Sequence, residues 1–357
     1  MAGFEAKHSR RSLLKGAGLT AAGLVAPTVW TGRAFGADQI TIADVGGAPQ
    51  AAIKQAFYDP FEKETGINVV SVVHESDPTA KFKVMVDTRS NLWDLCMVTR
   101  AHAYILSKPK DYLEPLLIDE SEAKDLVPGS LTPVWLGFSV YCTIMAYRTD
   151  KLKEGPKTWA DYWNVDKFPG RRALYKSPNG PLEAALMADG VAPKDLYPLD
   201  VDRAFKSLDK IKKHINVWWT SGAQNTQLLQ SGEVDITDTW GARAYAAIDG
   251  GSPVQMVFTE GVYSTDGWSI PKGCPKADLA RKFVRFCMRP EQQAIYSNIV
   301  ANGPTNTKAF QFISPERSKI LPTSPENVKG LQMSDSVWWA ANIAPVQERF
   351  QDWLIAG

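Results

Sequence analysis

The segment Phe57-Tyr58-Asp59-Pro60-Phe61-Glu62-Lys63-Glu64-Thr65-Gly66-Ile67-Asn68-Val69 joins an amphipathic helix to a β-strand. Phe57 and Phe61 recur at helical spacing, which predicts one apolar face of a helix over about 49–64. Gly66 then supplies the residue type that ends helices, because glycine adopts the left-handed conformation without strain. The β-branched run that follows predicts a strand. A helix that leads into a strand is the repeating unit of an α/β fold.

The same alternation of strands and helices continues along the chain. Strand–helix–strand spacing implies a parallel sheet with crossover helices, and the second half of the chain has its own alternation. We therefore expect an α/β protein with two lobes. The predicted strands are 40–45, 67–73, 93–98, 139–147, 172–175, 217–219, 234–239 and 254–258, and the predicted helices are 49–64, 79–90, 159–163, 181–187 and 201–214.

Residues 1–36 have the three parts of a secretory signal peptide. A basic segment, Ser9-Arg10-Arg11-Ser12-Leu13-Leu14-Lys15, precedes a mostly apolar run over 16–30, and small residues flank Phe35. The run is shorter than the roughly 20 apolar residues of a membrane span. The paired arginines are typical of the bacterial twin-arginine export machinery, with Leu13 where Phe is commoner. We expect cleavage near Gly36-Ala37 and a mature protein in the periplasm.

The charge of the mature chain argues against nucleic acid as a partner. Subtracting the five basic residues and one acidic residue of the leader from the chain's 40 and 39 leaves 35 basic and 38 acidic residues, a formal net charge of −3. A nucleic-acid binder normally shows a basic stripe or domain.

The sequence also carries no signature of a catalytic or cofactor site. It contains no HExxH, GxSxG, P-loop or GxGxxG motif, and its four histidines are scattered. We therefore expect no enzyme activity, no cofactor and no bound metal, and we keep an exported enzyme as a remote alternative. The four cysteines form no CxxC pair; we prefer buried free thiols to disulfides, since Cys96, Cys142 and Cys287 lie in apolar runs.

A set of short motifs occurs in a fixed order along the chain. The motifs are 57–69, Trp93-Asp94-Leu95, Thr158-Trp159-Ala160-Asp161-Tyr162-Trp163 ahead of Phe168-Pro169-Gly170-Arg171, Ser231-Gly232-Glu233-Val234-Asp235, Trp240, 261–271 and Gly303-Pro304-Thr305-Asn306. In this order they resemble the periplasmic solute-binding proteins of ABC importers, and the spermidine/putrescine-binding branch most closely. The resemblance covers nearly all of the mature chain. Each motif is weak alone, and their shared order makes the joint match specific.

The resemblance implies two lobes, joined by crossover strands, that close like a hinge on a small solute. Lobe one is expected to hold 38–142 and 266–310, and lobe two 143–265 and 311–357. The protein would act as a monomer and deliver its solute to an inner-membrane ABC permease.

Ligands of open α/β sheets bind beyond the carboxyl ends of the strands. This rule and the family pattern together select the candidate ligand-binding residues. They are Gly46, Gly47, Thr99, Arg100, Lys176, Ser177, Ser221, Gln224, Trp240, Tyr263 and Asp266.

The ligand is expected to contain an amine, with a polyamine as the first example. Trp240 and Asp266 stand where the family keeps a stacking tryptophan and an amine-binding aspartate, and buried cations need a carboxylate or an aromatic face. Other positions depart from the polyamine pattern. Arg100 and Lys176 favour the alternative of an anionic or zwitterionic solute, such as an amino-acid derivative, an opine-like acid or a phosphonate. The Gly46-Gly47 turn could add N–H donors to an anion.

Each of these residues also has a plain structural interpretation. Arg100 and Lys176 could be rim residues that pair with nearby acids. Trp240 could belong to the core, and Asp266 could cap a turn.

The paired arginines give a testable prediction about export. Changing both Arg10 and Arg11 to Lys should leave the precursor in the cytoplasm, because the twin-arginine machinery reads the pair itself. Cell fractionation measures this, with a reporter of the general secretory route as the control. Normal export of the double variant would exclude the twin-arginine route.

Overall fold

The computed structural model describes residues 38–74 and 77–356. The predicted leader and its cleavage site lie outside these residues. Among the helices that are described, none combines the length and the apolar character needed to cross a membrane.

The strands form one large mixed sheet, and most agree with the predicted ones within a few residues. Its main path runs β2-β1-β3-β10-β6-β9-β7-β8. The strands are β1 (Gln39–Asp44), β2 (Asn68–Val73), β3 (Leu95–Thr99), β4 (Leu113–Glu114), β5 (Leu131–Thr132), β6 (Trp135–Arg148), β7 (Arg172–Tyr175), β8 (Ile215–Trp219), β9 (Ile236–Trp240), β10 (Val254–Pro271), β11 (Gly303–Pro304) and β12 (Leu331–Met333).

Helices cover the sheet on both faces, as the α/β prediction requires. They are α1 (Gly47–Ile53), the π-helix η1 (Lys54–Tyr58), α2 (Asp59–Thr65), α3 (Thr79–Thr88), α4 (Arg100–Ser107), α5 (Trp159–Trp163), α6 (Pro181–Ala188), η2 (Pro193–Asp195), α7 (Val201–Lys212), α8 (Gly222–Ser231), α9 (Gly241–Asp249), α10 (Ala277–Cys287), α11 (Pro290–Ile299), η3 (Thr307–Phe312), α12 (Pro315–Ser318), η4 (Asn327–Gly330) and α13 (Ser336–Ile355). Gly66 ends α2 with φ of 72°, as predicted.

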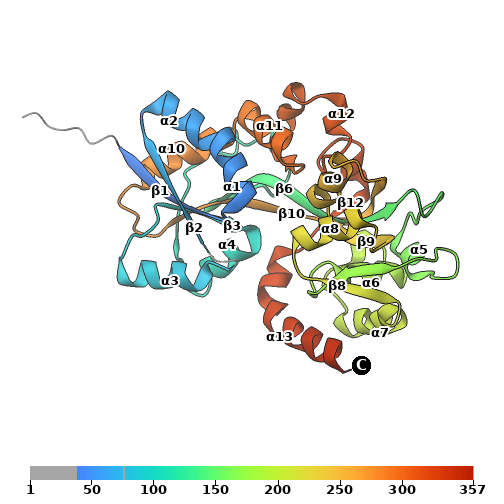
Figure 1. The fold of residues 1–357 in the computed structure, drawn as a ribbon. Helices are drawn as coiled ribbons and strands as arrows, with labels where there is room; N and C mark the ends of the chain where they lie inside the picture. Colours follow the sequence, from blue (N-terminus) through green and yellow to red (C-terminus); the bar gives the residue numbers. More distant parts are fainter. Residues whose placement is uncertain (1–37, 75–76, 357) are drawn as a thin grey trace, which may run out of the picture. The chain divides into compact units, whose positions relative to one another are not determined.

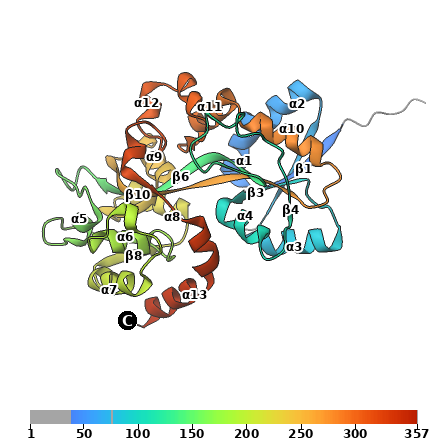
Figure 2. The ribbon, with the colours of Figure 1, turned by 180° about the vertical axis from the view of Figure 1, so that it is seen from behind.

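Two long antiparallel strands, β6 and β10, connect the two halves of the sheet (Figures 1 and 2). At one end β10 pairs with β3, which pairs with β1 and through it β2. At the other end β6 pairs with β9, which leads to β7 and β8. The chain therefore crosses between a β1–β3 half and a β7–β9 half through one shared strand pair.

The structure corrects the sequence prediction in two respects. The predicted strand at 254–258 is the first part of β10, which continues unbroken for 18 residues. The helices α4, α8, α9, α10, α11 and α13 were not among the predicted helices; α8, for example, is polar and has no clear apolar periodicity.

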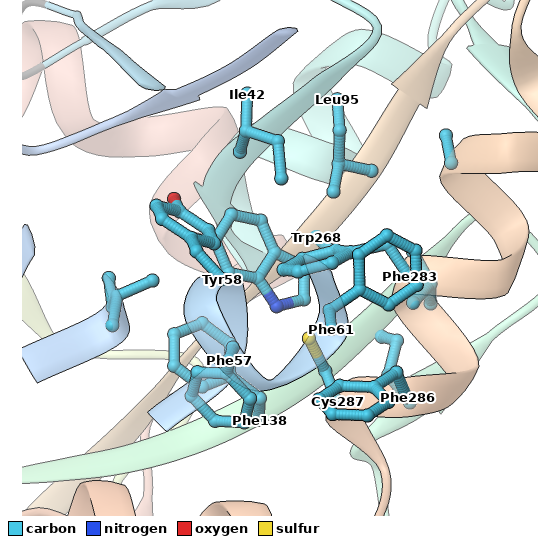
Figure 3. Close-up of a cluster of buried hydrophobic side chains, with 14 of the residues drawn as sticks. Ile42, Phe57, Tyr58, Phe61, Leu95, Phe138, Trp268, Phe283, Phe286 and Cys287 are labelled. Carbon is cyan, nitrogen blue, oxygen red and sulfur yellow. The ribbon is translucent and has the colours of Figure 1, made fainter. Parts of the chain in front are cut away.

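Each half of the sheet has its own apolar core. Phe138 of β6 and Trp268 of β10 stack at 4.9 Å between ring centroids, and Phe57 meets Phe138 edge-on at 5.3 Å (Figure 3). A second core lies under α5, α6, α7 and α13. All four cysteines are buried and free, as preferred from the sequence.

Truncating Phe138 tests whether the crossover pair supports the first core. Phe138→Ala should lower the free energy of unfolding by about 3–5 kcal/mol, because it leaves a cavity between fully buried rings. Leu92→Ala, at a side chain that is 54% exposed, should change it by less than about 0.5 kcal/mol. Chemical denaturation measures both. Equal effects would show that the ring contributes little.

Candidate ligand-binding site

The carboxyl ends of both parallel strand sets point toward the middle of the β6–β10 pair. Thr99, the last residue of β3, pairs with Asp266, which pairs with Ser139 of β6. Trp240, the last residue of β9, pairs with Thr143. The two ends lie four residue steps apart along β6, about 13 Å at the rise of an antiparallel strand. The predicted site residues from the two halves thus meet across one short stretch of β6 and β10.

Three aromatic rings gather at the ends of β7, β8 and β9. Tyr175 stacks on Trp219 at 4.3 Å between centroids, and Trp240 meets these rings edge-on at 5.5 and 5.3 Å. Behind them Asp238 is buried and accepts a 2.7 Å hydrogen bond from Nε1 of Trp219. Burial raises the pKa of Asp238 to about 7. Trp240 itself is only half-buried, so the rings hold it in place without covering it.

Asp266 lies inside β10, not in a turn, so the turn-cap interpretation is wrong. Its side chain is half-buried, and no described residue forms a hydrogen bond or an ion pair with its carboxylate. Burial raises its pKa to about 7. Tyr141 and Tyr296 lie close enough for the Asp266 charge to contribute to their own raised pKa values. Asp266 is thus a carboxylate that the described protein leaves without a cation.

The Gly46-Gly47 turn follows β1 and begins α1. Gly46 has φ of 69° and donates its N–H to Oδ1 of Asp44 at 2.9 Å. A Cβ at Gly46 would lie 2.9 Å from Val73, so the turn requires glycine for both reasons. Tyr58 donates a 2.8 Å hydrogen bond to the other oxygen of Asp44. Buried Asp44 therefore fixes the turn.

Ser221 and Gln224 lie at the start of α8. Oγ of Ser221 caps the helix by accepting from the N–H of Gln224 at 3.2 Å. Oε1 of Gln224 accepts from the N–H of Thr220 at 2.8 Å. Both side chains are engaged in the local turn, so the structure gives them a capping role beside the aromatic rings.

The adjacent helix α9 begins differently, without a side-chain cap and without an acidic residue in its first turn. Its first N–H groups therefore lack the usual acceptors. Arg243 stands in this first turn and lies against the start of α8, where a Cβ at Gly222 would be 3.1 Å from Cζ of Arg243. No described carboxylate pairs with the Arg243 guanidinium, which is half-buried. Two helix starts and one guanidinium thus make a positive region beside Trp240.

Lys176 and Ser177 follow β7, as expected. Lys176 is exposed and Ser177 half-buried, and the N–H of Lys176 donates to the carbonyl oxygen of Trp219 at 2.8 Å. No described acid pairs with the Lys176 ammonium group, so the interpretation as a paired rim residue is not supported. The Lys176 backbone lies beside Trp219, at the same ends of β7 and β8 as the aromatic rings.

Arg100 is the first residue of α4, next to Thr99, whose hydroxyl caps the helix. Nη1 of Arg100 lies 3.8 Å from Sδ of Met333. The guanidinium borders a small cavity with Tyr263 and Gly129. No described contact joins Arg100 to Asp266 or Trp240. The structure therefore brings Arg100 together with Tyr263, at the edge of β10.

Sequence reasoning missed Arg243, Tyr141 and Tyr175. Tyr175 directly precedes Lys176, so the strand-end rule already pointed to it. Arg243 follows Trp240 by three residues, and a basic residue at a helix start is a weak signal. Tyr141 could not be found, since only the register of β6 against β10 places it opposite Ser264.

Within the described residues, no group of three or more His, Cys, Asp and Glu side chains could hold a metal ion. The candidate site is therefore built from aromatic rings, hydroxyls and separated charges.

Comparison with known proteins gives a consistent result. Residues 56–323 match the family described as bacterial extracellular solute-binding protein. The chain is 34% identical to the gamma-aminobutyric acid-binding protein of Pseudomonas aeruginosa, over 88% of this chain and 90% of that protein. It is 24% identical to the spermidine/putrescine-binding periplasmic protein of Escherichia coli, over 80% and 84%.

A solved ABC transporter substrate-binding protein from Bradyrhizobium japonicum shares the fold. It is 36% identical, with a TM-score of 0.81, over 88% of this chain and 99% of that chain. The predicted family and two-lobe fold are thus confirmed. The chain belongs to the bacterial extracellular solute-binding proteins, and it is the substrate-binding component of an ABC transporter.

Proposed function

We propose that the chain binds a small zwitterion with an ammonium group at one end and a carboxylate at the other, such as gamma-aminobutyrate. The observation that carries the proposal is the pair of uncompensated charges: the Asp266 carboxylate on β10 and the Arg243 guanidinium at the start of α9. No described residue neutralises either charge.

The ammonium group would lie against Asp266. A partly buried carboxylate without a partner costs stability, and a bound cation removes that cost. Tyr141 lies beside Asp266 and can accept or donate a hydrogen bond through its hydroxyl. Ser139, directly opposite Asp266, already bonds to Asn302 Nδ2 at 3.0 Å.

The carboxylate would lie at the start of α9. An uncapped helix N-terminus is a ready anion site, because its free N–H groups and the helix dipole both favour negative charge. Arg243 adds a guanidinium that can hold a carboxylate through two N–H donors. Lys176 contributes longer-range attraction.

Trp240 is the last residue of β9, directly before the start of α9 that carries Arg243, and its half-buried ring suits the methylene groups that join the ends of such a solute. Asp266 and Trp240 pair with positions of β6 that lie about 13 Å apart along the strand, and side chains reach into this interval. An α-amino acid, with both charges on neighbouring atoms, would span it poorly.

A polyamine is the second candidate, favoured by Trp240 and Asp266 and by the spermidine/putrescine-binding relative. Arg243 and Lys176 oppose it, since both would repel the second ammonium group. The predicted use of Arg100 for the acid end is a further alternative, and we assign that role to Arg243.

The remaining features follow the family. We propose export by the twin-arginine machinery, cleavage near Gly36-Ala37, and a monomer that acts in the periplasm without catalysis. The lobe boundaries 38–142 with 266–310 and 143–265 with 311–357 remain our proposal. Closure of these lobes on the solute would present it to the permease.

The raised pKa of Asp266 makes stability without ligand depend on pH. A carboxyl whose folded-state pKa exceeds its unfolded value of 3.8 loses its stabilising contribution as pH rises toward about 7. Asp266→Asn should therefore match the wild type near pH 4 and exceed it by about 1–3 kcal/mol at pH 8, allowing for solvent screening. Denaturation at both pH values measures this, with exposed Asp352→Asn as control. A constant difference across pH would contradict the assignment.

The binding proposal predicts a pattern across variants. Asp266→Asn and Arg243→Gln should each weaken gamma-aminobutyrate binding by 2–5 kcal/mol, about 30-fold to several thousand-fold, because each leaves one ligand charge unpaired. Putrescine, if it binds, should lose affinity with Asp266→Asn and keep or gain it with Arg243→Gln. Calorimetry measures all of these affinities.

Exposed Lys282→Gln, far along the chain on α10, is the matched control and should change nothing. If Arg100→Gln abolishes gamma-aminobutyrate binding and Arg243→Gln does not, the ligand carboxylate binds Arg100 and not Arg243. Affinities within threefold of the wild type for both Asp266→Asn and Arg243→Gln would refute the proposed site.

A further inference from the structure

We propose a second ligand site, for a small oxyanion, in the cavity that Arg100 and Lys194 share with the start of α13. This cavity is lined by Tyr197, Ser334 and Ser336 and has a volume of about 260 Å³. None of Trp240, Arg243 and Asp266 borders it, so it is separate from the proposed solute site.

Arg100 occupies an unusual electrostatic position. It is the first residue of α4, whose first turn contains no acidic residue. A cation at a helix N-terminus is disfavoured by about 0.3–1 kcal/mol, since the helix dipole is positive there. No described acid pairs with the Arg100 guanidinium. A bound anion would interact favourably with both the Arg100 guanidinium and the positive end of the α4 dipole.

A second cation and a second helix start lie on the same cavity. The ammonium group of Lys194 has no acid partner among the described residues. α13 is 20 residues long and begins at the cavity with Ser336. The carboxylate that faces these charges is Asp335, and its Oδ1 accepts from the N–H groups of Val337 and Trp338 at 2.9 Å each. The cavity is therefore bordered by two cations, Arg100 and Lys194, and by one carboxylate, Asp335, which already caps α13.

Hydroxyl groups complete the surroundings of Arg100. A smaller adjoining cavity, also bordered by Arg100, is lined by Ser130 and Thr265, which are 3% and 9% exposed. Neither hydroxyl forms a hydrogen bond with a described residue. Ser334, 8% exposed, lies on both cavities with its Oγ 3.2 Å from the Tyr197 hydroxyl oxygen. Hydroxyl groups that line a cavity can donate hydrogen bonds to the oxygens of an oxyanion.

The size of the cavity suits a hydrated oxyanion. Each water takes about 30 Å³ in the liquid, so the volume holds a tetrahedral anion and several waters. Arg100 and Ser130 come from the β1–β3 half of the chain, and Ser334 and Ser336 from its C-terminal segment. A bound oxyanion would therefore hold α4 and α13, which contact each other, in this arrangement.

Titration with inorganic phosphate at fixed ionic strength tests the site. We expect saturable one-to-one binding to the full-length mature protein by calorimetry. Arg100→Gln and Lys194→Gln should each weaken it at least tenfold, and Lys282→Gln should not. Lys194 is exposed, so its substitution tests the site without disturbing the fold. A parallel titration with malonate separates a phosphate-type ligand from a carboxylate-type ligand.

Absence of saturable binding of both anions to the wild type would overturn the proposal. So would equal affinities in the wild type, Arg100→Gln and Lys194→Gln. If the loss follows Arg243→Gln instead, phosphate occupies the start of α9 and the second site does not exist. Lys194 belongs to no version of the proposed solute site, so phosphate and gamma-aminobutyrate titrations of Lys194→Gln let each proposal fail alone.

Discussion

The pairing of β6 with β10 is the constraint on which the rest of the structure depends. At one end of this pair β10 forms hydrogen bonds with β3, and at the other end β6 forms hydrogen bonds with β9. The pair therefore positions both halves of the sheet. It also carries the stacked Phe138 and Trp268 into the first core. Because strand ends and core residues share this ladder, a shift of register by one residue would turn Asp266 to the other face.

The same pair sets charges apart that would otherwise neutralise one another. Asp266 is anchored on β10, while Arg243 is carried by a helix that starts after β9. The two residues belong to different backbone elements, and no described contact joins their side chains. Within residues 38–74 and 77–356 neither the Asp266 carboxylate nor the Arg243 guanidinium has a partner of opposite charge, which costs stability where the group is partly buried. A solute with complementary ends would remove both costs, which links recognition directly to stability.

The sequence by itself determined most of the fold. The apolar spacing of Phe57 and Phe61, the stop at Gly66 and the β-branched runs depend on neighbouring residues, so local pattern predicts them. The order of short motifs along the chain was sufficient to predict the family to which the chain belongs. Trp240 and Asp266 were selected as candidates because each stands at a recognisable place within that order. Helices such as α8 were missed because tertiary contacts, not an apolar stripe, stabilise them.

Only the tertiary structure decided which candidates lie together. Arg100 and Asp266 are both next to Thr99 in the fold, yet no contact joins them, because Arg100 begins a helix at the edge of β10. Arg243 became a candidate because its side chain lies against the start of α8, a segment that is distant from it in the sequence. The absence of partners for these charges is likewise a property of packing. Strand register, helix starts and burial are long-range consequences of folding, and a linear pattern of residue types does not contain them.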